Sequence, residues 1–170
     1  KKKNHPLLNI NLPKKLKINK FSSDILNRKW DLIVIAVSSI GIDLIGKNLS
    51  KIKNKLPILV LTKGLKLDGR NLISMSSLLR KYNKNLNISV LKGPCLAKEL
   101  AKKVKSFTVV ANKNINTAKK IGKLISTNYY QTEFSRDVNG VEFLSAIKNI
   151  YSMIIGAGQW HNTSSALFRK

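Results

Sequence analysis

The sequence has few acidic residues, few histidines and a single cysteine. Only 8 of its 170 residues are Asp or Glu against 32 Lys or Arg, so the formal net charge is +24 at pH 7. Cys95 stands alone, which excludes an internal disulfide and fits a reducing compartment, here expected to be the cytoplasm. His5 and His161 lie far apart and outside any Cys, Asp or Glu cluster, so no metal site is expected.

Arginine and aromatic residues are also scarce, which argues against a nucleic-acid reader. Aromatic residues make up 6% of the chain and do not alternate with basic ones. Nucleic-acid-binding proteins rely on arginine for bidentate contacts and on aromatic rings for stacking. We therefore expect no specific nucleic-acid partner and interpret the lysine excess as compositional drift. A non-catalytic, lysine-rich module that binds anions or nucleic acid is the alternative. The arginines are Arg28, Arg70, Arg80, Arg136 and Arg169.

No apolar run has the form of a signal peptide or a membrane span. The start, "KKKNHPLLNINLPKK", is basic, but its apolar part is short and broken by prolines. The chain also begins without an initiator Met, which suggests that it starts inside a longer protein.

Strand-like and helix-like patterns alternate along most of the chain. Such alternation, with apolar strands, is typical of an α/β fold with a mostly parallel sheet covered on both faces. Apolar runs of strand length occur at 31–37, 57–64, 87–94, 106–112 and 129–134. Apolar residues recur at helical spacings of three and four at 40–52, 71–82, 96–104 and 116–126.

The alternation stops after Arg136. The following stretch, up to Gly158, is too long and too apolar for another surface helix, and Asp137 or Asn139 is placed to cap it. We expect two domains, an α/β domain over 1–136 and the start of a helical domain over 137–170.

Three predicted strand ends carry residues suited to ligand binding. They are "AVSS" (36–39), "TKGL" (62–65), where Gly64 permits a tight turn, and "KGPCLAKEL" (92–100), where a strand leads into a helix. In open α/β sheets, ligands bind at the carboxyl ends of the strands. We expect the three segments to meet at one edge of the sheet.

Lys148 lies in the middle of the apolar segment 140–158. On a helix it lies beside a narrow polar seam formed by Glu142, Ser145, Asn149 and Ser152. Such a seam in a buried helix lines a cleft or packs against polar backbone, whereas a lysine near a domain edge can also extend its ammonium group to solvent. Spacing alone leaves both interpretations open.

Together these segments resemble the nicotinamide-dependent glycerol-3-phosphate dehydrogenases. The family's strand ends in T-K-G and G-P-[ST]-x-A-x-E, and its helical-domain K-N-x-x-x-x-x-x-G, have counterparts here in the same order, with Cys95 at the Ser/Thr position. "HPLLNINLP" and "NTSSALFRK" resemble two further family segments. The resemblance implies a truncated Rossmann-like sheet followed by the first long helix of an all-α domain.

The resemblance also implies an activity and roles for particular residues. Members interconvert dihydroxyacetone phosphate and sn-glycerol 3-phosphate with NAD or NADP. Lys148 would be the catalytic acid/base, and its apolar surroundings would disfavour its charged form. Homodimer formation is an expectation for the full-length protein only. The remaining implied contacts are Lys63, Gly93, Cys95, Asn149 and Asn162 for substrate, and Ser38, Ser39, Lys63 and Ala97 for cofactor.

The chain also departs from the family pattern. It has no G-x-G-x-x-G between a strand and a helix, and it ends soon after the helical domain begins, so we expect a fragment with little activity alone. Cys95 replaces a usual Ser or Thr, Ser164 stands where lysine is usual, and the Gly158–Asn162 connection is short. Ketopantoate reductases and 3-hydroxyacid dehydrogenases, which share the architecture and a helical-domain lysine, are the alternatives among enzymes.

Overall fold

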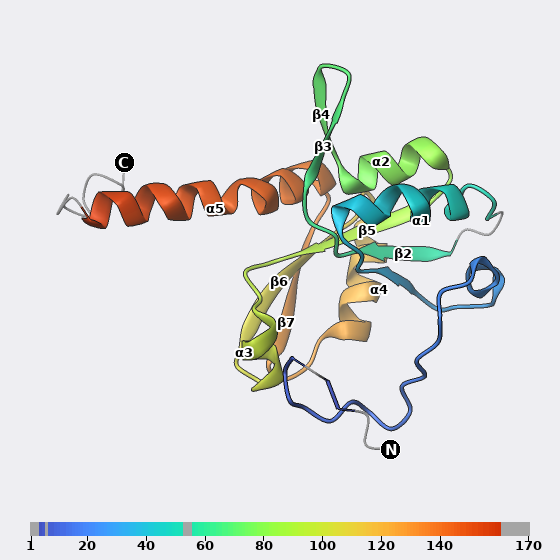
Figure 1. Cartoon of the computed structure of the whole chain (residues 1–170), viewed down its shortest axis with the longest axis horizontal. Helices are drawn as coiled ribbons and strands as arrows, with labels where there is room; N and C mark the ends of the chain where they lie inside the picture. Colours follow the sequence, from blue (N-terminus) through green and yellow to red (C-terminus); the bar gives the residue numbers. More distant parts are fainter. Residues whose placement is uncertain (1–3, 6, 53–55, 161–170) are drawn as a thin grey trace.

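A five-stranded sheet forms the centre of the protein. The computed structural model describes residues 4–5, 7–52 and 56–160, and Figure 1 shows its arrangement. The strand order is β1-β2-β5-β6-β7, and all five predicted strands are present. Their bounds are β1 (Ile33–Ile35), β2 (Pro57–Val60), β5 (Asn87–Lys92), β6 (Ser106–Ala111) and β7 (Tyr130–Ser135).

The sheet is mostly parallel, as predicted, but one strand pair runs in opposite directions. β1–β2, β2–β5 and β6–β7 are parallel, whereas β5 and β6 pair antiparallel, with Val90 opposite Ala111 and Lys92 opposite Val109. The amino ends of β6 and β7 therefore lie at the same edge as the carboxyl ends of β1, β2 and β5.

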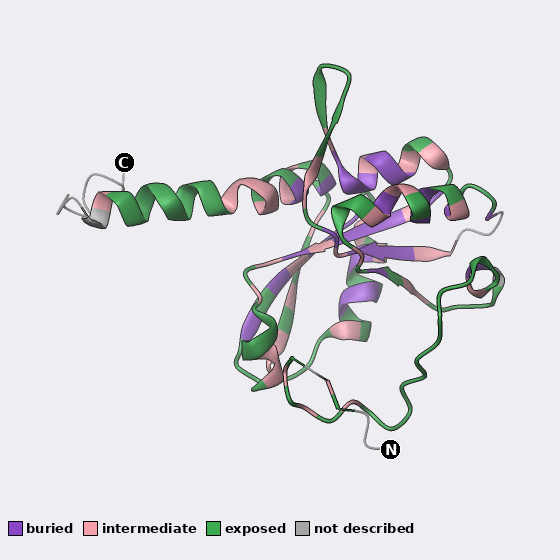
Figure 2. Cartoon of the chain, viewed as in Figure 1, coloured by how far each residue is buried: buried purple, intermediate pink, exposed green. Residues whose placement is uncertain are grey.

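Helices cover both faces of the sheet, which confirms the predicted layers. Because alternate strand residues point to opposite faces, Ile58 and Val60 join one core cluster, whereas Leu59 packs with Val110 and Ile121 in another. The inner surfaces of these layers are the buried regions in Figure 2. The helices are α1 (Ile42–Leu49) and α2 (Met75–Tyr82) on the first face and α4 (Ile115–Ile125) on the second. The short helices η1 (Ser23–Asn27), η2 (Ser39–Gly41) and α3 (Ala97–Ala101) complete the body.

A β-hairpin stands where the sequence pattern predicted the start of a helix. β3 (Leu65–Asp68) and β4 (Asn71–Ser74) pair antiparallel and project from the body (Figure 1). The expected helix over 71–82 begins only at Met75, because the Ser74 hydroxyl accepts a hydrogen bond from the Ser77 amide at 3.3 Å and so caps α2 there.

The long helix α5 (Val138–Trp160) begins where the sequence predicts. Asp137 caps it, because its Oδ1 accepts a hydrogen bond from the Gly140 amide at 2.8 Å. The expectation that this segment is too apolar for a surface helix is wrong. Of its side chains over 138–158 only Val138 and Glu142 are buried, and its second half extends away from the body and is exposed (Figure 2). Met153, for example, is 73% exposed. Across the described ranges, no helix combines the length and hydropathy that crossing a membrane requires.

Candidate functional site

The three predicted strand ends do meet at one edge of the sheet, because β1, β2 and β5 are parallel. After β2 the chain turns at Gly64, whose φ of +127° lies where side chains are strained. A Cβ placed on Gly64 would lie 3.5 Å from the Cβ of Ser39. The turn therefore brings the Lys63 segment beside Ser38 and Ser39, both of which are exposed.

One cavity of about 240 Å³ opens below the Lys63 turn. It joins residues from five elements or their ends, and it unites four of the positions that the resemblance implied, namely Lys63, Gly93, Cys95 and Ala97. Among its lining residues are Lys63, Lys92, Gly93, Cys95, Ala97, Thr108 and Tyr130.

A second cavity of about 240 Å³ lies beside the first and shares Lys92 and Gly93 with it. Its other wall is α5, which contributes Leu144, Ser145 and Lys148. The Ser145 hydroxyl is buried and has no hydrogen-bond partner among the described residues. Such an unpaired group is suited to a ligand oxygen, since buried hydroxyls are normally hydrogen-bonded.

Gly93 separates the two cavities at a point of close backbone approach. A Cβ at this position would lie 2.8 Å from the carbonyl oxygen of Phe107 and 3.0 Å from the Cα of Thr108. Because both neighbours are backbone atoms, no side chain fits without moving β6. Glycine here lets β5 pass β6 closely and continue to Cys95.

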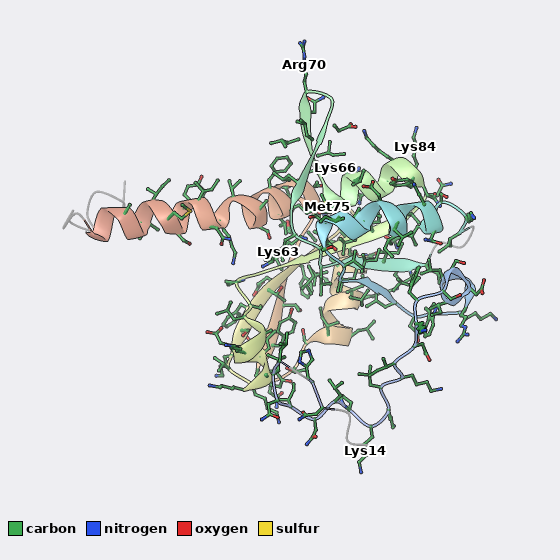
Figure 3. All side chains as sticks on the ribbon, viewed as in Figure 1. Lys14, Lys63, Lys66, Arg70, Met75 and Lys84 are labelled. Carbon is green, nitrogen blue, oxygen red and sulfur yellow. The ribbon has the colours of Figure 1, made fainter. Side chains whose placement is uncertain are left out.

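The charges of Lys63 and Lys148 both influence the pKa of the Cys95 thiol. Burial raises the pKa of Cys95, and the positive charges of Lys63 and Lys148 oppose that rise. Their charges thus reach the same point although 84 residues separate them in the chain, from position 63 to position 148. Figure 3 labels Lys63 on the side of the body where α5 begins.

The most deeply buried lysine at this edge is Lys92 rather than Lys148, whose burial the sequence pattern left open. Lys92 is 4% exposed, whereas Lys148 is half-buried. The Lys92 ammonium group donates to the carbonyl oxygens of Leu61, at 3.4 Å, and Thr62. Burial lowers the pKa of Lys92 to about 8; the charge of Glu142 opposes this change and that of Lys63 adds to it.

The lowered pKa of Lys92 predicts a rise in stability at alkaline pH. Between about pH 8 and 10.5 the folded chain has released the Lys92 proton while the unfolded chain still binds it. Stability therefore increases through this window, by at most roughly 3 kcal/mol at 1.36 kcal/mol per pKa unit, and levels off above it. Urea unfolding at pH 7, 8, 9 and 10 measures the change. In Lys92→Met the rise in unfolding free energy between about pH 8 and 10.5 should be absent. If the unfolding free energies of the two proteins depended on pH in the same way, the prediction would be contradicted.

Glu142 forms a buried polar cluster that joins α5 to α2. Glu142 is 3% exposed, and its carboxylate accepts hydrogen bonds from the Ser76 amide, at 3.1 Å, and the Ser76 hydroxyl. Arg80 donates to the Ser76 hydroxyl at 3.3 Å and to the Ile88 carbonyl at 3.2 Å. Burial lowers the pKa of Arg80, and the Glu142 charge opposes this change. The polar seam of α5 is thus buried at Glu142, half-buried at Ser145 and exposed beyond.

Of the substrate positions implied by the resemblance, one is not brought to the cavities and another cannot be placed among the described residues. Asn149 is exposed on α5 and lines neither cavity, and Asn162 lies outside the described residues. Sequence reasoning in turn missed Lys92, Thr108 and Tyr130. The last two belong to β6 and β7, and if these strands ran parallel to β5 both residues would lie at the opposite edge. The only available signal for Lys92 was a lysine ending an apolar strand.

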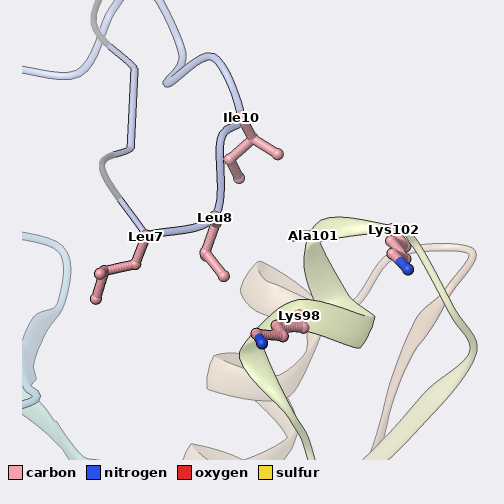
Figure 4. Close-up of a pocket in the computed structure, with 6 residues that line it drawn as sticks. All are labelled: Leu7, Leu8, Ile10, Lys98, Ala101 and Lys102. Atoms are coloured by element: carbon pink, nitrogen blue, oxygen red, sulfur yellow. The ribbon is translucent and has the colours of Figure 1, made fainter.

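A third cavity, of about 220 Å³, lies between the N-terminal segment and α3 (Figure 4). Leu7, Leu8 and Ile10 face Lys98, Ala101 and Lys102 across it. It contains no carboxylate, thiol or imidazole, so we assign no chemistry to it. Within the part of the chain that the structure describes, no three Cys, His, Asp or Glu side chains are grouped to hold a metal ion.

Comparison with known proteins gives a consistent result. The sequence model of the NAD-dependent glycerol-3-phosphate dehydrogenase N-terminus matches residues 1–118. The glycerol-3-phosphate dehydrogenase [NAD(P)+] of Leptospira biflexa is 33% identical over 167 residues, which is 94% of this chain and 49% of that protein. The Neorickettsia sennetsu enzyme of the same name is 33% identical over 144 residues, covering 81% of this chain and 42% of its own.

Solved structures show the same fold. The crystal structure of glycerol-3-phosphate dehydrogenase from Coxiella burnetii superimposes with a TM-score of 0.76 at 22% identity, over 92% of this chain and 47% of that one. The structure of the Plasmodium falciparum enzyme superimposes with a TM-score of 0.70 at 19% identity, over 80% of this chain and 38% of that one. The chain thus spans about half the length or less of the relatives that it matches. From the family model and the curated relatives together, the chain belongs to the NAD(P)-dependent glycerol-3-phosphate dehydrogenase family.

Proposed function

We propose that the protein containing this chain transfers a hydride between NAD or NADP and the dihydroxyacetone phosphate/glycerol 3-phosphate pair. The observation that carries the proposal is the convergence of Lys63 and Lys148 on the Gly93–Cys95 segment, with the unpaired Ser145 hydroxyl in the same cavity as Lys148. Lysines at two adjoining small cavities favour an anionic substrate of the size of a triose phosphate.

The implied residues that line the cavities or lie beside Gly64 have roles that their places support. The nicotinamide ring supplies or accepts the hydride when bound, and exposed Ser38 and Ser39 beside Gly64 fit that end of the cofactor. Lys148 donates a proton to the substrate oxygen and stabilises the negative charge that develops there. Lys63 orients the substrate and the cofactor, and Gly93, Cys95 and Ala97 form the wall against which they lie. Asn149 and Asn162 stay proposed contacts from the resemblance alone.

Three broader statements belong to the same proposal. The α/β domain extends over 1–136 and the helical domain begins at 137, as the departure of α5 from the body supports. The protein acts in the cytoplasm, as the single cysteine supports. The full-length enzyme is a homodimer without a specific nucleic-acid partner.

The activity itself is tested on a protein of full family length that contains this chain. Oxidation of NADH and NADPH is followed with dihydroxyacetone phosphate, ketopantoate and a 3-keto acid as separate substrates. Turnover with dihydroxyacetone phosphate at least ten times that with the others is expected. A preference for either of the other two would overturn the assignment, because those substrates belong to the alternative lysine-dependent dehydrogenases.

Replacing Lys63 with alanine should lower turnover and also weaken apparent substrate affinity in that protein. Both parameters change because Lys63 is placed to touch the substrate and to orient the cofactor, so that its loss removes charge and alignment together. A combined loss of roughly 100-fold in kcat/KM is expected. Lys123→Ala, an exposed lysine of α4, is the matched control. A steady-state profile like that of the control would reduce Lys63 to a surface turn residue.

A further inference from the structure

A row of three buried side chains crosses the strand ends at the candidate site. The Thr62 hydroxyl donates to the Val37 carbonyl at 2.7 Å, the Lys92 ammonium group donates to the Thr62 carbonyl, and the Thr108 hydroxyl donates to the Lys92 carbonyl at 2.8 Å. Thr62 and Lys92 are each 4% exposed and Thr108 is 2% exposed. The row runs from the end of β1 through β2 and β5 to β6.

Each bond in this row holds the backbone directly before a candidate site residue. Val37 precedes Ser38, and Lys92 precedes Gly93. Thr62, held by Lys92, precedes Lys63. The row therefore holds the backbone at the three points where ligand-facing segments leave the sheet.

The row begins where the backbone ladders end. The last register pairs are Ile35–Val60 between β1 and β2 and Val60–Val90 between β2 and β5. One further backbone bond joins the Leu61 amide to the Ile35 carbonyl at 2.9 Å. Buried backbone carbonyl groups past the last paired strand residues need other hydrogen-bond donors, because an unpaired buried carbonyl group costs free energy of folding. The Lys92 ammonium group supplies them to Leu61 and Thr62.

A lysine suits this place better than a smaller polar residue. Its ammonium group has three donors on a long stem, so it reaches two carbonyl groups of the neighbouring strand at once, whereas a serine hydroxyl has one donor. A buried positive charge needs compensation. The charge of Glu142 on α5 favours the ammonium form of Lys92, and that of Lys63 opposes it. Lys92 lines both the cavity that Lys63 lines and the cavity that Lys148 lines.

We propose that Lys92 is a positioning residue of this site: its ammonium group holds the end of β2 and thereby fixes Lys63 relative to Gly93 and Lys148. This inference rests on the proposed function for its catalytic consequence, but its structural part does not. Lys92 acts through Lys63 and has no assigned contact with substrate or cofactor.

The structural part is tested by amide hydrogen exchange on the 170-residue chain. In Lys92→Met the Leu61 amide, the last backbone bond of β2, should exchange about tenfold faster or more, because the strand end opens locally. The amides of Val90 and Val110 in the sheet interior should keep their rates. Lys92→Arg, which retains donors, should restore much of the protection, and Lys123→Met serves as the control. Unchanged exchange at Leu61, or an equal increase throughout the sheet, would overturn the inference.

The catalytic part is tested by a double-mutant cycle in the protein of full family length. Lys92→Met alone should lower kcat/KM about tenfold, and it should add little to the loss already caused by Lys63→Ala, because both changes remove the same aligned group. Multiplicative losses would show that Lys92 does not act through Lys63 and would overturn the inference. An inactive wild-type enzyme would overturn the proposed function instead, and the exchange experiment would still decide whether Lys92 anchors the end of β2.

Discussion

Replacing Lys148 with methionine is expected to lower the turnover of the full-length enzyme by roughly 100-fold or more, the usual effect of removing a positioned proton donor. Lys148 lines the cavity that Gly93 and Ser145, with its unpaired hydroxyl, also line. Methionine keeps the length of the side chain and its apolar contacts but cannot donate a proton. The expected loss is therefore in kcat, measured with dihydroxyacetone phosphate and the reduced cofactor.

Stability provides the control for this experiment. Lys148 is only half-buried, so its loss should move the melting temperature by no more than a few degrees. Turnover and melting temperature are measured on the same preparation, beside Lys123→Met in α4. Activity near that of the wild type would mean that Lys148 only extends its charge to solvent. A loss of stability large enough to explain the lost activity would equally rule out the catalytic assignment.

Replacing Glu142 with leucine is expected to destabilise the 170-residue chain by about 3–5 kcal/mol, the usual cost of removing one partner from a buried charged cluster. The change removes the acceptor for the Ser76 amide and hydroxyl and leaves the charges of Arg80 and Lys92 without compensation. It also removes the polar link between α5 and α2. The free energy of unfolding is measured from urea denaturation at pH 7.

Two variants make this prediction specific. Glu142→Gln keeps the size and part of the hydrogen bonding, so it should cost less than leucine but still destabilise the chain. Glu99→Gln changes an exposed carboxylate of α3 and should stay within about 0.5 kcal/mol of the wild type. If Glu142→Leu were no more harmful than Glu99→Gln, the cluster would not hold α5 to the body.

The β3–β4 hairpin shows how local patterns misled the sequence analysis. Residues 71–82 repeat apolar side chains at helical spacing, and that period predicted a helix through Asn71–Ser74. The pair Asp68–Gly69 precedes it, and Gly69 has a φ of +61° in the turn. Gly69 and Arg70 form the two-residue loop between β3 and β4, where a glycine with positive φ is favoured. The pairing of Asn71–Ser74 with β3 therefore overrides the helical period of this stretch.

The direction of β6 could not be read from the sequence at all. An apolar run such as 106–111 looks the same whether its strand runs parallel or antiparallel to its neighbour. The choice depends on how the segment from Gly93 to Lys105, with its short helix α3, returns the chain to the sheet. That choice brought Thr108 and Tyr130 to the site edge.

The sequence by itself determined the family, the α/β layers and the strand ends that carry the candidate site, because apolar periodicity and short motifs are properties of neighbouring residues. Only the tertiary structure decided which lysine is deeply buried. Burial depends on what packs against a side chain from distant segments, and β2 and Glu142 of α5 enclose Lys92, whereas the exposed second half of α5 leaves Lys148 half-buried. For the same reason the row of Thr62, Lys92 and Thr108 became visible only once three strands lay side by side.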